Sequence, residues 1–268
     1  MFRLFSRVKT VSSLHHKMQI KGDNYKSGKS LIQDVIGMRI VLYFQDDVDA
    51  LAFFYSCGEV VSTSIDEFDT STFRPQRLNL TCNLPAEFVN EFRKALPEEF
   101  APYIDNTYEI QIRTIFSEGW HEVEHDLRYK CKEDWEGCES YSRILNGVIA
   151  TLETAEWNMK ALFDQMARIN FQNKNYRAML RNKMHLRIKG EGLSENVNKY
   201  LLQNPHVSES ILNSDRFVII LTLLNHKNTI ELTYDNLIFL INRIEMNNQE
   251  LRDLESESTR KMLDVFFA

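Results

Sequence analysis

Tyr108-Glu-Ile-Gln-Ile-Arg-Thr114 gives the clearest indication of the fold of this protein. Side chains alternate between the two faces of a strand, so Glu109, Gln111 and Arg113 point one way and the two isoleucines point the other. This pattern predicts a half-buried strand over 107–113. Its polar face is either solvated or occupied by a ligand, because burying such groups without partners costs free energy.

Other segments of the first half carry further strand and helix signals. Val35–Phe44 is a continuous apolar run interrupted by Arg39, and the stretch behind it, with an acidic first turn, predicts a helix up to Cys57. Pro85 begins another predicted helix, which ends near Leu96. Two more strand candidates are Val60–Ile65 and Leu78–Leu84. Strands separated by helices indicate an α/β or α+β sheet domain of roughly 130 residues.

The second half of the chain is predicted to be nearly all helix, because it has only one proline and three glycines beyond residue 140. From Leu145 to Met166 apolar residues recur at spacings of three and four, as one face of a long helix requires. That face is expected to form a bundle core or a seam between copies, so we expect a homo-oligomer. Further helices are predicted at about 173–187, 193–203, 214–225, 233–247 and 250–266. The expected domains are 1–135 and 136–268.

The placement of charge narrows the class of partner. The chain has a formal net charge of −6, yet residues 1–30 carry seven lysines and arginines against Asp23 alone. An acidic protein is a poor general DNA binder, because non-specific affinity comes mainly from neutralising phosphates. The basic segment therefore favours a small polyphosphate such as a nucleotide over a duplex. The alternative is a solvated basic arm.

Other sequence features favour a cytoplasmic protein that is not bound to a membrane. The longest apolar run, Phe217–Leu224, is under half the length that a transmembrane helix needs. The amino terminus lacks the apolar core of a signal peptide. The four cysteines form no C-x-x-C pair and are too few for a disulfide framework in a chain of 268 residues.

Two motifs match known signatures only in part. His121-Glu-Val-Glu-His125 fits the H-E-x-x-H pattern of zinc proteases, but no glycine and third histidine follow at the extended spacing. Zinc hydrolysis is kept as a minor alternative. Gly22–Ser30 resembles a phosphate loop with one residue too many between its glycines, and no strand precedes it. A flexible basic loop is expected there instead.

Four blocks follow one another between about residues 5 and 130. They are Arg7-Val-Lys9-Thr10 with Ser13 and Lys17, Asp34-Val-Ile-Gly37-Met-Arg39-Ile40, Tyr108-Glu-Ile-Gln-Ile-Arg-Thr114, and Trp120 with Glu124-His125 and Tyr129-Lys130. In order and spacing they resemble the synthetase domain of the RelA/SpoT-type alarmone synthetases. The resemblance implies an α+β fold, a mixed β-sheet flanked by helices as in nucleotidyltransferases, followed here by an all-helical carboxy-terminal region. It also implies transfer of pyrophosphate from ATP to the 3′-hydroxyl of a guanosine nucleotide, often in a homotetramer.

The resemblance carries roles to individual residues. The arginine pair Arg7 and Arg39 is expected to sandwich adenine, as planar guanidinium groups do well. Three side chains are expected to hold the ATP phosphates: Lys9, Ser13 and Lys17. Two acids, Asp34 and Glu109, are expected to be catalytic and to bind Mg²⁺, which usually takes one or two protein carboxylates. Asp34 and Arg39 are five residues apart, so on a regular strand their side chains would face opposite sides. For both to reach one site, either Asp34 precedes the strand or Gly37 marks a bulge.

The acceptor block departs from the family. Its usual tyrosine, which stacks on the acceptor guanine, is replaced by Pro75, and its histidine by Asn79. Phe73 is a candidate to replace the stacking ring. The residues expected to bind the acceptor are Arg77, Asn79, Gln111 and Arg113. Two alternatives stay open: the same chemistry on an adenosine nucleotide or the 3′ end of tRNA, and a catalytically inactive nucleotide-binding module.

Overall fold

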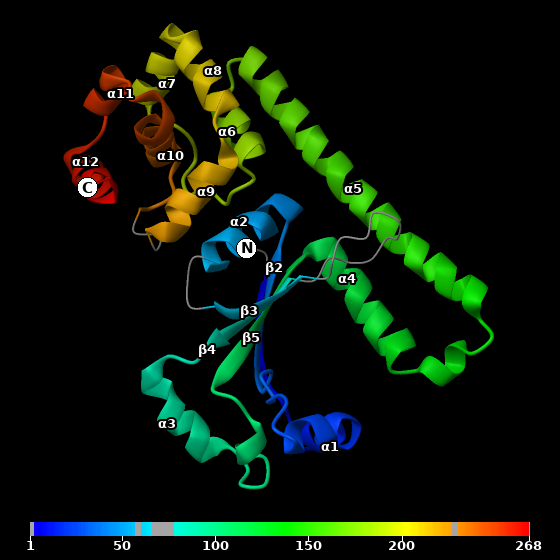
Figure 1. Ribbon diagram of the computed structural model, residues 1–268. Helices are drawn as coiled ribbons and strands as arrows, with labels where there is room; N and C mark the ends of the chain where they lie inside the picture. The colour runs from blue at the N-terminus through cyan, green and yellow to red at the C-terminus, as the bar shows by residue number, and fades with distance from the viewer. Residues whose placement is uncertain (1–2, 57–59, 66–77, 227–229, 268) are drawn as a thin grey trace. The chain divides into compact units, whose positions relative to one another are not determined.

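A computed structural model describes residues 3–56, 60–65, 78–226 and 230–267 (Figure 1). Contacts between Cα atoms divide the chain into two compact units, Met1–Glu156 and Trp157–Ala268. Each unit has its own apolar core.

The first unit is built on a mixed five-stranded sheet with the strand order β1-β2-β5-β4-β3 (Figure 1). The central pair β2–β5 is parallel, and the other neighbours are antiparallel. The predicted mixed sheet with flanking helices is confirmed. The strands are β1 (Arg3–Val8), β2 (Ile36–Leu42), β3 (Val60–Ile65), β4 (Leu78–Asn83) and β5 (Thr107–Thr114).

One face of the sheet is apolar and is covered by α2 (Gln45–Ser56) (Figure 1). Ile110 and Ile112 of β5 are buried there against Val48 of α2, as their alternation predicted. A smaller core lies between α1 (Val11–Lys26) and the segment that follows α3 (Ala86–Ala95). The opposite face of the sheet therefore carries the polar side chains of β5.

The amino-terminal segment is more ordered than its composition suggested. It forms β1 and then α1, whose first turn is capped by the side chain of Thr10. The flexible loop expected over 22–30 is wrong in its first half, because Gly22–Lys26 continue α1. The turn comes at Gly28, whose φ of 71° lies in the left-handed region that glycine adopts without steric cost.

The start of β2 settles the geometry of Asp34. The strand begins at Ile36, so Asp34 precedes it. Gly37 pairs regularly with Arg7 on one side and Glu109 on the other, without a bulge. The first of the two alternatives is confirmed.

The second unit is helical, as the scarcity of proline and glycine predicted. Its helices pack on a core that includes Leu180, Ile211 and Leu237. After α4 (Ile115–Glu124), the long α5 (Glu139–Gln172) leads into this unit. The other helices are α6 (Tyr176–Met184), α7 (Glu195–Gln203), α8 (Pro205–Asn213), α9 (Arg216–Asn225), α10 (Tyr234–Ile241), α11 (Gln249–Asp253) and α12 (Glu257–Phe266).

Two boundaries in this unit differ from the predictions. No helix is predicted between 203 and 214, yet α8 starts at Pro205, because proline is well tolerated in the first turn of a helix. The single helix expected over 250–266 is two helices. Ser256 accepts a hydrogen bond from the backbone of Thr259 and so starts α12. Among the described residues no helix is both long and apolar enough to cross a membrane.

Candidate functional site

The polar face of the sheet holds a cavity of about 500 Å³ between β1, β2, β5 and α4. Strand register aligns its residues in rows. Arg7 lies opposite Gly37, which lies opposite Glu109, and in the next row Arg39 lies opposite Gln111. The side chain of Arg7 packs over Gly37, 3.5 Å from where a Cβ would stand, which is an ordinary van der Waals distance. The predicted pair Arg7 and Arg39 thus lines one cavity.

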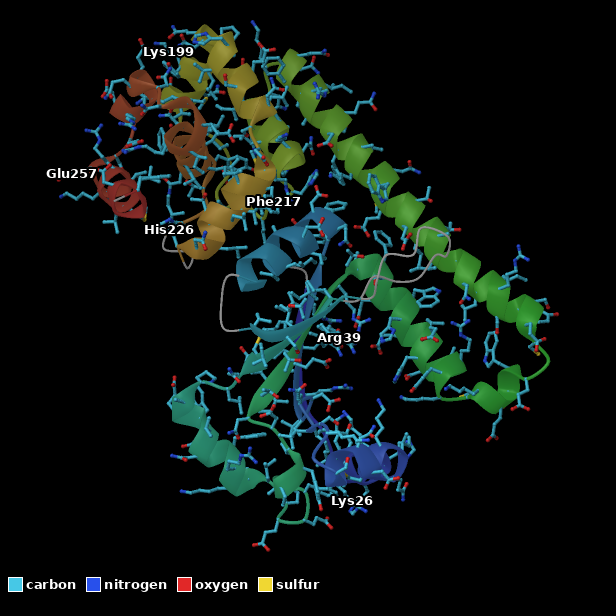
Figure 2. All side chains as sticks on the ribbon, in the orientation of Figure 1. Lys26, Arg39, Lys199, Phe217, His226 and Glu257 are labelled. Carbon is cyan, nitrogen blue, oxygen red and sulfur yellow. The ribbon has the colours of Figure 1, made fainter. Side chains whose placement is uncertain are left out.

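Arg39 projects from β2 (Figure 2) and is held by groups from two elements. Its Nε donates to Oε1 of Gln111 at 3.2 Å. Its Nη1 donates to Oε1 of Glu118 at 2.5 Å and also to Oε1 of Glu122, both on α4. Burial lowers the pKa of Arg39, but hydrogen bonds with Glu122 and Glu118 outweigh burial and leave it above its usual value. The guanidinium is therefore fixed in place as a cation.

Gln111 connects the charged groups of β5. Its Oε1 also accepts from Nη2 of Arg113 at 3.4 Å, and its Nε2 donates to Oε2 of Glu109 at 3.0 Å. Arg113 is buried, and its Nε lies 3.7 Å from Oε2 of Glu118. Glu118 thus contacts both Arg39 and Arg113, and these contacts hold the side chains of this part of the site in place.

Asp34 is the centre of a second cluster, just before β2. Lys9 and Lys17 donate to its carboxylate oxygens at 2.9 and 2.7 Å. Burial raises the pKa of Asp34, but the hydrogen bonds and charges of Lys17 and Lys9 outweigh it, and the net pKa lies below the usual value. Asp34 is therefore ionised at neutral pH, with two cations gathered around it.

The amino terminus of α1 lies directly beside these lysines in sequence. Thr10 accepts a hydrogen bond from the backbone N–H of Ser13 at 3.3 Å, and the two hydroxyl oxygens are 2.9 Å apart. Orphan N–H groups and the helix dipole favour an anion at such an end. Together with Lys9 and Lys17, this arrangement suits a phosphate chain.

Two carboxylates are available for a divalent cation. Asp34 lies two residues before β2 and Glu109 lies near the start of the adjacent parallel strand β5. Both sit at the same end of the sheet, and a carboxylate pair completed by phosphate oxygens and water is a donor set that Mg²⁺ accepts.

The zinc alternative lacks a third ligand. His121 and His125 do lie one turn apart, with ring centroids 5.7 Å from each other. Within the described parts of the chain, however, no three histidine, cysteine or acidic side chains are grouped so that they could hold a metal ion. The catalytic zinc of a protease is held by three protein ligands.

The predicted acceptor residues are only partly placed. Arg77, together with Pro75 and Phe73, lies outside the described residues. Asn79 lies opposite Gln111 on the polar face, and its buried Oδ1 has no hydrogen-bond partner among the described residues. Asn79 does not itself line the cavity, but its strand partner Gln111 does, and a buried acceptor without a partner can accommodate a ligand donor.

Glu118 and Glu122 are site residues that the sequence analysis missed. Glu124, which belongs to the fourth block of the resemblance, does not line the cavity and pairs with Arg128 at 3.2 Å. The available signal was the spacing of two acids by one helical turn, which places them on one face. Trp120 of the same block is buried in α4.

Comparison with known proteins bears on this region. Residues 6–134 match the family described as "Region found in RelA / SpoT proteins". None of the curated proteins matches the sequence.

Solved structures are similar at low identity. A GTP pyrophosphokinase family protein from Streptococcus pneumoniae is 21% identical, with a TM-score of 0.42, over 59% of this chain and 74% of that chain. Small alarmone synthetase 1 from Bacillus subtilis is 21% identical, with a TM-score of 0.41, over 59% of this chain and 78% of that chain. The same synthetase bound to its product pppGpp is 23% identical, with a TM-score of 0.39, over 59% of this chain and 76% of that chain.

Proposed function

We propose, from the match of residues 6–134 to the region found in RelA/SpoT proteins, that the chain transfers pyrophosphate from ATP to the 3′-hydroxyl of a guanosine nucleotide. The observation that carries the proposal is the cluster of Lys9 and Lys17 on Asp34 beside the amino terminus of α1. It gathers cations, orphan N–H groups and a carboxylate at one place. Phosphoryl-group transfer needs these groups to neutralise the reacting phosphates.

Binding of ATP changes the partners in this cluster. The triphosphate takes the ammonium groups of Lys9 and Lys17, with the Ser13 hydroxyl, at the amino terminus of α1. Adenine enters the cavity between the guanidinium groups of Arg7 and Arg39, the second of which Glu118 and Glu122 hold in place. Asp34 and Glu109 would hold Mg²⁺, which would neutralise phosphate charge.

The transfer step is a displacement at the β-phosphorus. A bond forms between the acceptor's 3′-oxygen and the β-phosphorus, and the bond from that phosphorus to the α,β-bridging oxygen breaks. AMP leaves, and the hydroxyl proton passes to the carboxylate of Glu109. Because Gln111 donates to Oε2 of Glu109 at 3.0 Å, the orientation of this carboxylate is fixed.

A second acceptor class is supported by the departure at Pro75 and Asn79. Without the usual tyrosine and histidine, an adenosine nucleotide or the 3′ end of tRNA is the alternative acceptor, and the orphan Oδ1 of Asn79 is available to it. Each acceptor should be incubated separately with the protein and ATP labelled at the γ-phosphate. The acceptors are GDP, GTP, AMP, ATP and tRNA.

We expect label in a guanosine product. Label in AMP, ATP or tRNA would support the alternative acceptor. No transfer to any acceptor, with ATP still bound, would contradict the proposal and leave a nucleotide-binding module.

A further inference from the structure

The second unit carries a segregated block of positive charge outside the RelA/SpoT-type region. Residues 165–190 contain seven lysines and arginines and no acid. Residues 191–268 contain seven lysines and arginines against twelve acids, a net of −5. In a chain whose overall charge is −6, this block is not a consequence of average composition.

The fold turns this block into one surface. α6 buries Met179 and Leu180, which leaves Arg177 and Arg181 exposed on the other side, about 6 Å apart along the helix axis at 1.5 Å per residue. Lys174, two residues before α6, is exposed as well. In the segment after α6, Leu186 and Ile188 pack on the core, so the alternating Arg187 and Lys189 face solvent.

Contacts join the helix to the segment that follows it. The guanidinium of Arg177 lies 5.9 Å from the centre of the Tyr234 ring, and its side chain lies close to Gly192. Lys189 forms an isolated parallel bridge with Thr233, the neighbour of Tyr234. We call Lys174, Arg177, Arg181, Arg187 and Lys189 the basic surface.

The cations of the basic surface are largely unneutralised. Lys189 pairs with Glu231 at 3.2 Å. Within the part of the chain that the structure describes, the other four have no carboxylate within 4 Å. Elsewhere in the same unit Arg243 contacts both Glu255 and Asp264. Mutual repulsion among unpaired cations is relieved by an anionic partner.

We propose that the basic surface binds the phosphate backbone of duplex RNA. Arginine forks match phosphate geometry, and Arg177 is already held in place by Tyr234. Across the described residues from 170 to 201 no large apolar side chain is exposed, so the surface lacks both the ring needed to stack unpaired bases and the apolar edge needed to enter a bilayer.

RNA is favoured over DNA because amides lie among the cations. Gln172 and Asn173 are exposed beside Lys174, and a carboxamide donates and accepts hydrogen bonds as a ribose 2′-hydroxyl does. A backbone reader of this kind recognises the shape of a duplex rather than its sequence.

The test is a titration of the full chain into a labelled RNA duplex of about 16 base pairs, followed by fluorescence anisotropy at about 50 and 200 mM KCl. The test variant combines Lys174→Gln, Arg177→Gln and Arg181→Gln. The control removes equal charge elsewhere in the unit through Lys199→Gln (Figure 2), Arg260→Gln and Lys261→Gln. Thermal melts check that both variants are folded.

We expect the test variant to bind about 10- to 100-fold more weakly at low salt, with a salt slope reduced by about 3, and the control to change little. A charge-keeping variant with Arg177→Lys and Arg181→Lys should keep most of the salt slope. Equal loss in the control, an unchanged test variant, equal binding of a DNA duplex, or binding only to anionic vesicles would each overturn the inference.

This inference does not depend on the proposed reaction. The Asp34→Asn chain should bind the duplex as the unchanged chain does. Pyrophosphate transfer without RNA binding would therefore contradict the basic surface alone, and RNA binding without transfer would contradict only the proposed reaction.

Discussion

The two units differ in how their arginines are paired. In the first unit Arg39 contacts Gln111, Glu118 and Glu122. In the second unit Arg181 is exposed and has no carboxylate partner among the described residues. The first arrangement fixes a cation before any ligand arrives, which lowers the ordering cost of binding a small molecule. The second leaves charge available to a large polyanion, where many weak contacts add up.

The largest effect is expected from the removal of one carboxylate of the first unit. Asp34→Asn or Glu109→Gln should lower pyrophosphate transfer by about 10²- to 10³-fold, because each leaves Mg²⁺ and the phosphates short of a charged ligand. The rate is measured with γ-labelled ATP, and circular dichroism checks the fold. Undiminished turnover in either folded variant would contradict the mechanism.

The exposed apolar face of α5 is expected to bind a second copy of the chain. On α5, Val148, Leu162 and Met166 are more than 40% exposed although they lie on one helix face. We expect a dimer or tetramer in solution, measured by light scattering at low micromolar concentration, and a smaller species for Leu162→Glu. The opposite-face variant Trp157→Glu is the control. If the unchanged chain is a monomer near 31.6 kDa, this face does not bind a second copy and the prediction is wrong.

Glu118 and Glu122 both pair with Arg39 but differ in burial, so they allow a buried and an exposed ion pair to be compared. The Glu118 side chain is 13% exposed and lies near the buried Arg113, whereas the Glu122 side chain is 54% exposed. Glu118→Ala should lower the free energy of unfolding by about 2–4 kcal/mol, because it leaves a buried guanidinium without its carboxylate. Glu122→Ala should cost about 1 kcal/mol or less. Urea denaturation measures the free energy of unfolding of both variants. Equal losses would show that the burial of the ion pair does not determine its contribution to stability.

The smallest expected effect is the pH dependence of the Asp34 cluster. The pKa of Asp34 is lower in the folded chain than in the unfolded chain, so the contribution of Asp34 to stability is complete above the ordinary carboxyl pKa. That contribution is lost as the pH falls through the lower folded value. The difference in stability between the unchanged chain and Asp34→Asn should therefore shrink between neutral pH and about pH 3. A difference that grows on acidification would contradict this assignment.

Local patterns were enough to predict several parts of this protein. Alternation at Glu109, Gln111 and Arg113 gave the faces of β5, and the spacing of Asp34 from Arg39 gave two options of which one is observed. Such patterns act between neighbours in the chain, where period and propensity dominate. The helix α8 was not predicted, although Pro205 at its first turn is compatible with a helix.

Contacts between distant residues decided the rest. Nothing in the local sequence places Glu118 on Arg39, which is 79 positions away, or two lysines on Asp34, because these pairings follow from which strands are neighbours and which helix crosses them. Sequence by itself determined the faces of the strands, the helical second half and the charge block at 165–190. Only the tertiary structure decided which charges are paired, since a side chain's partner depends on packing across the sheet rather than on its neighbours in the chain.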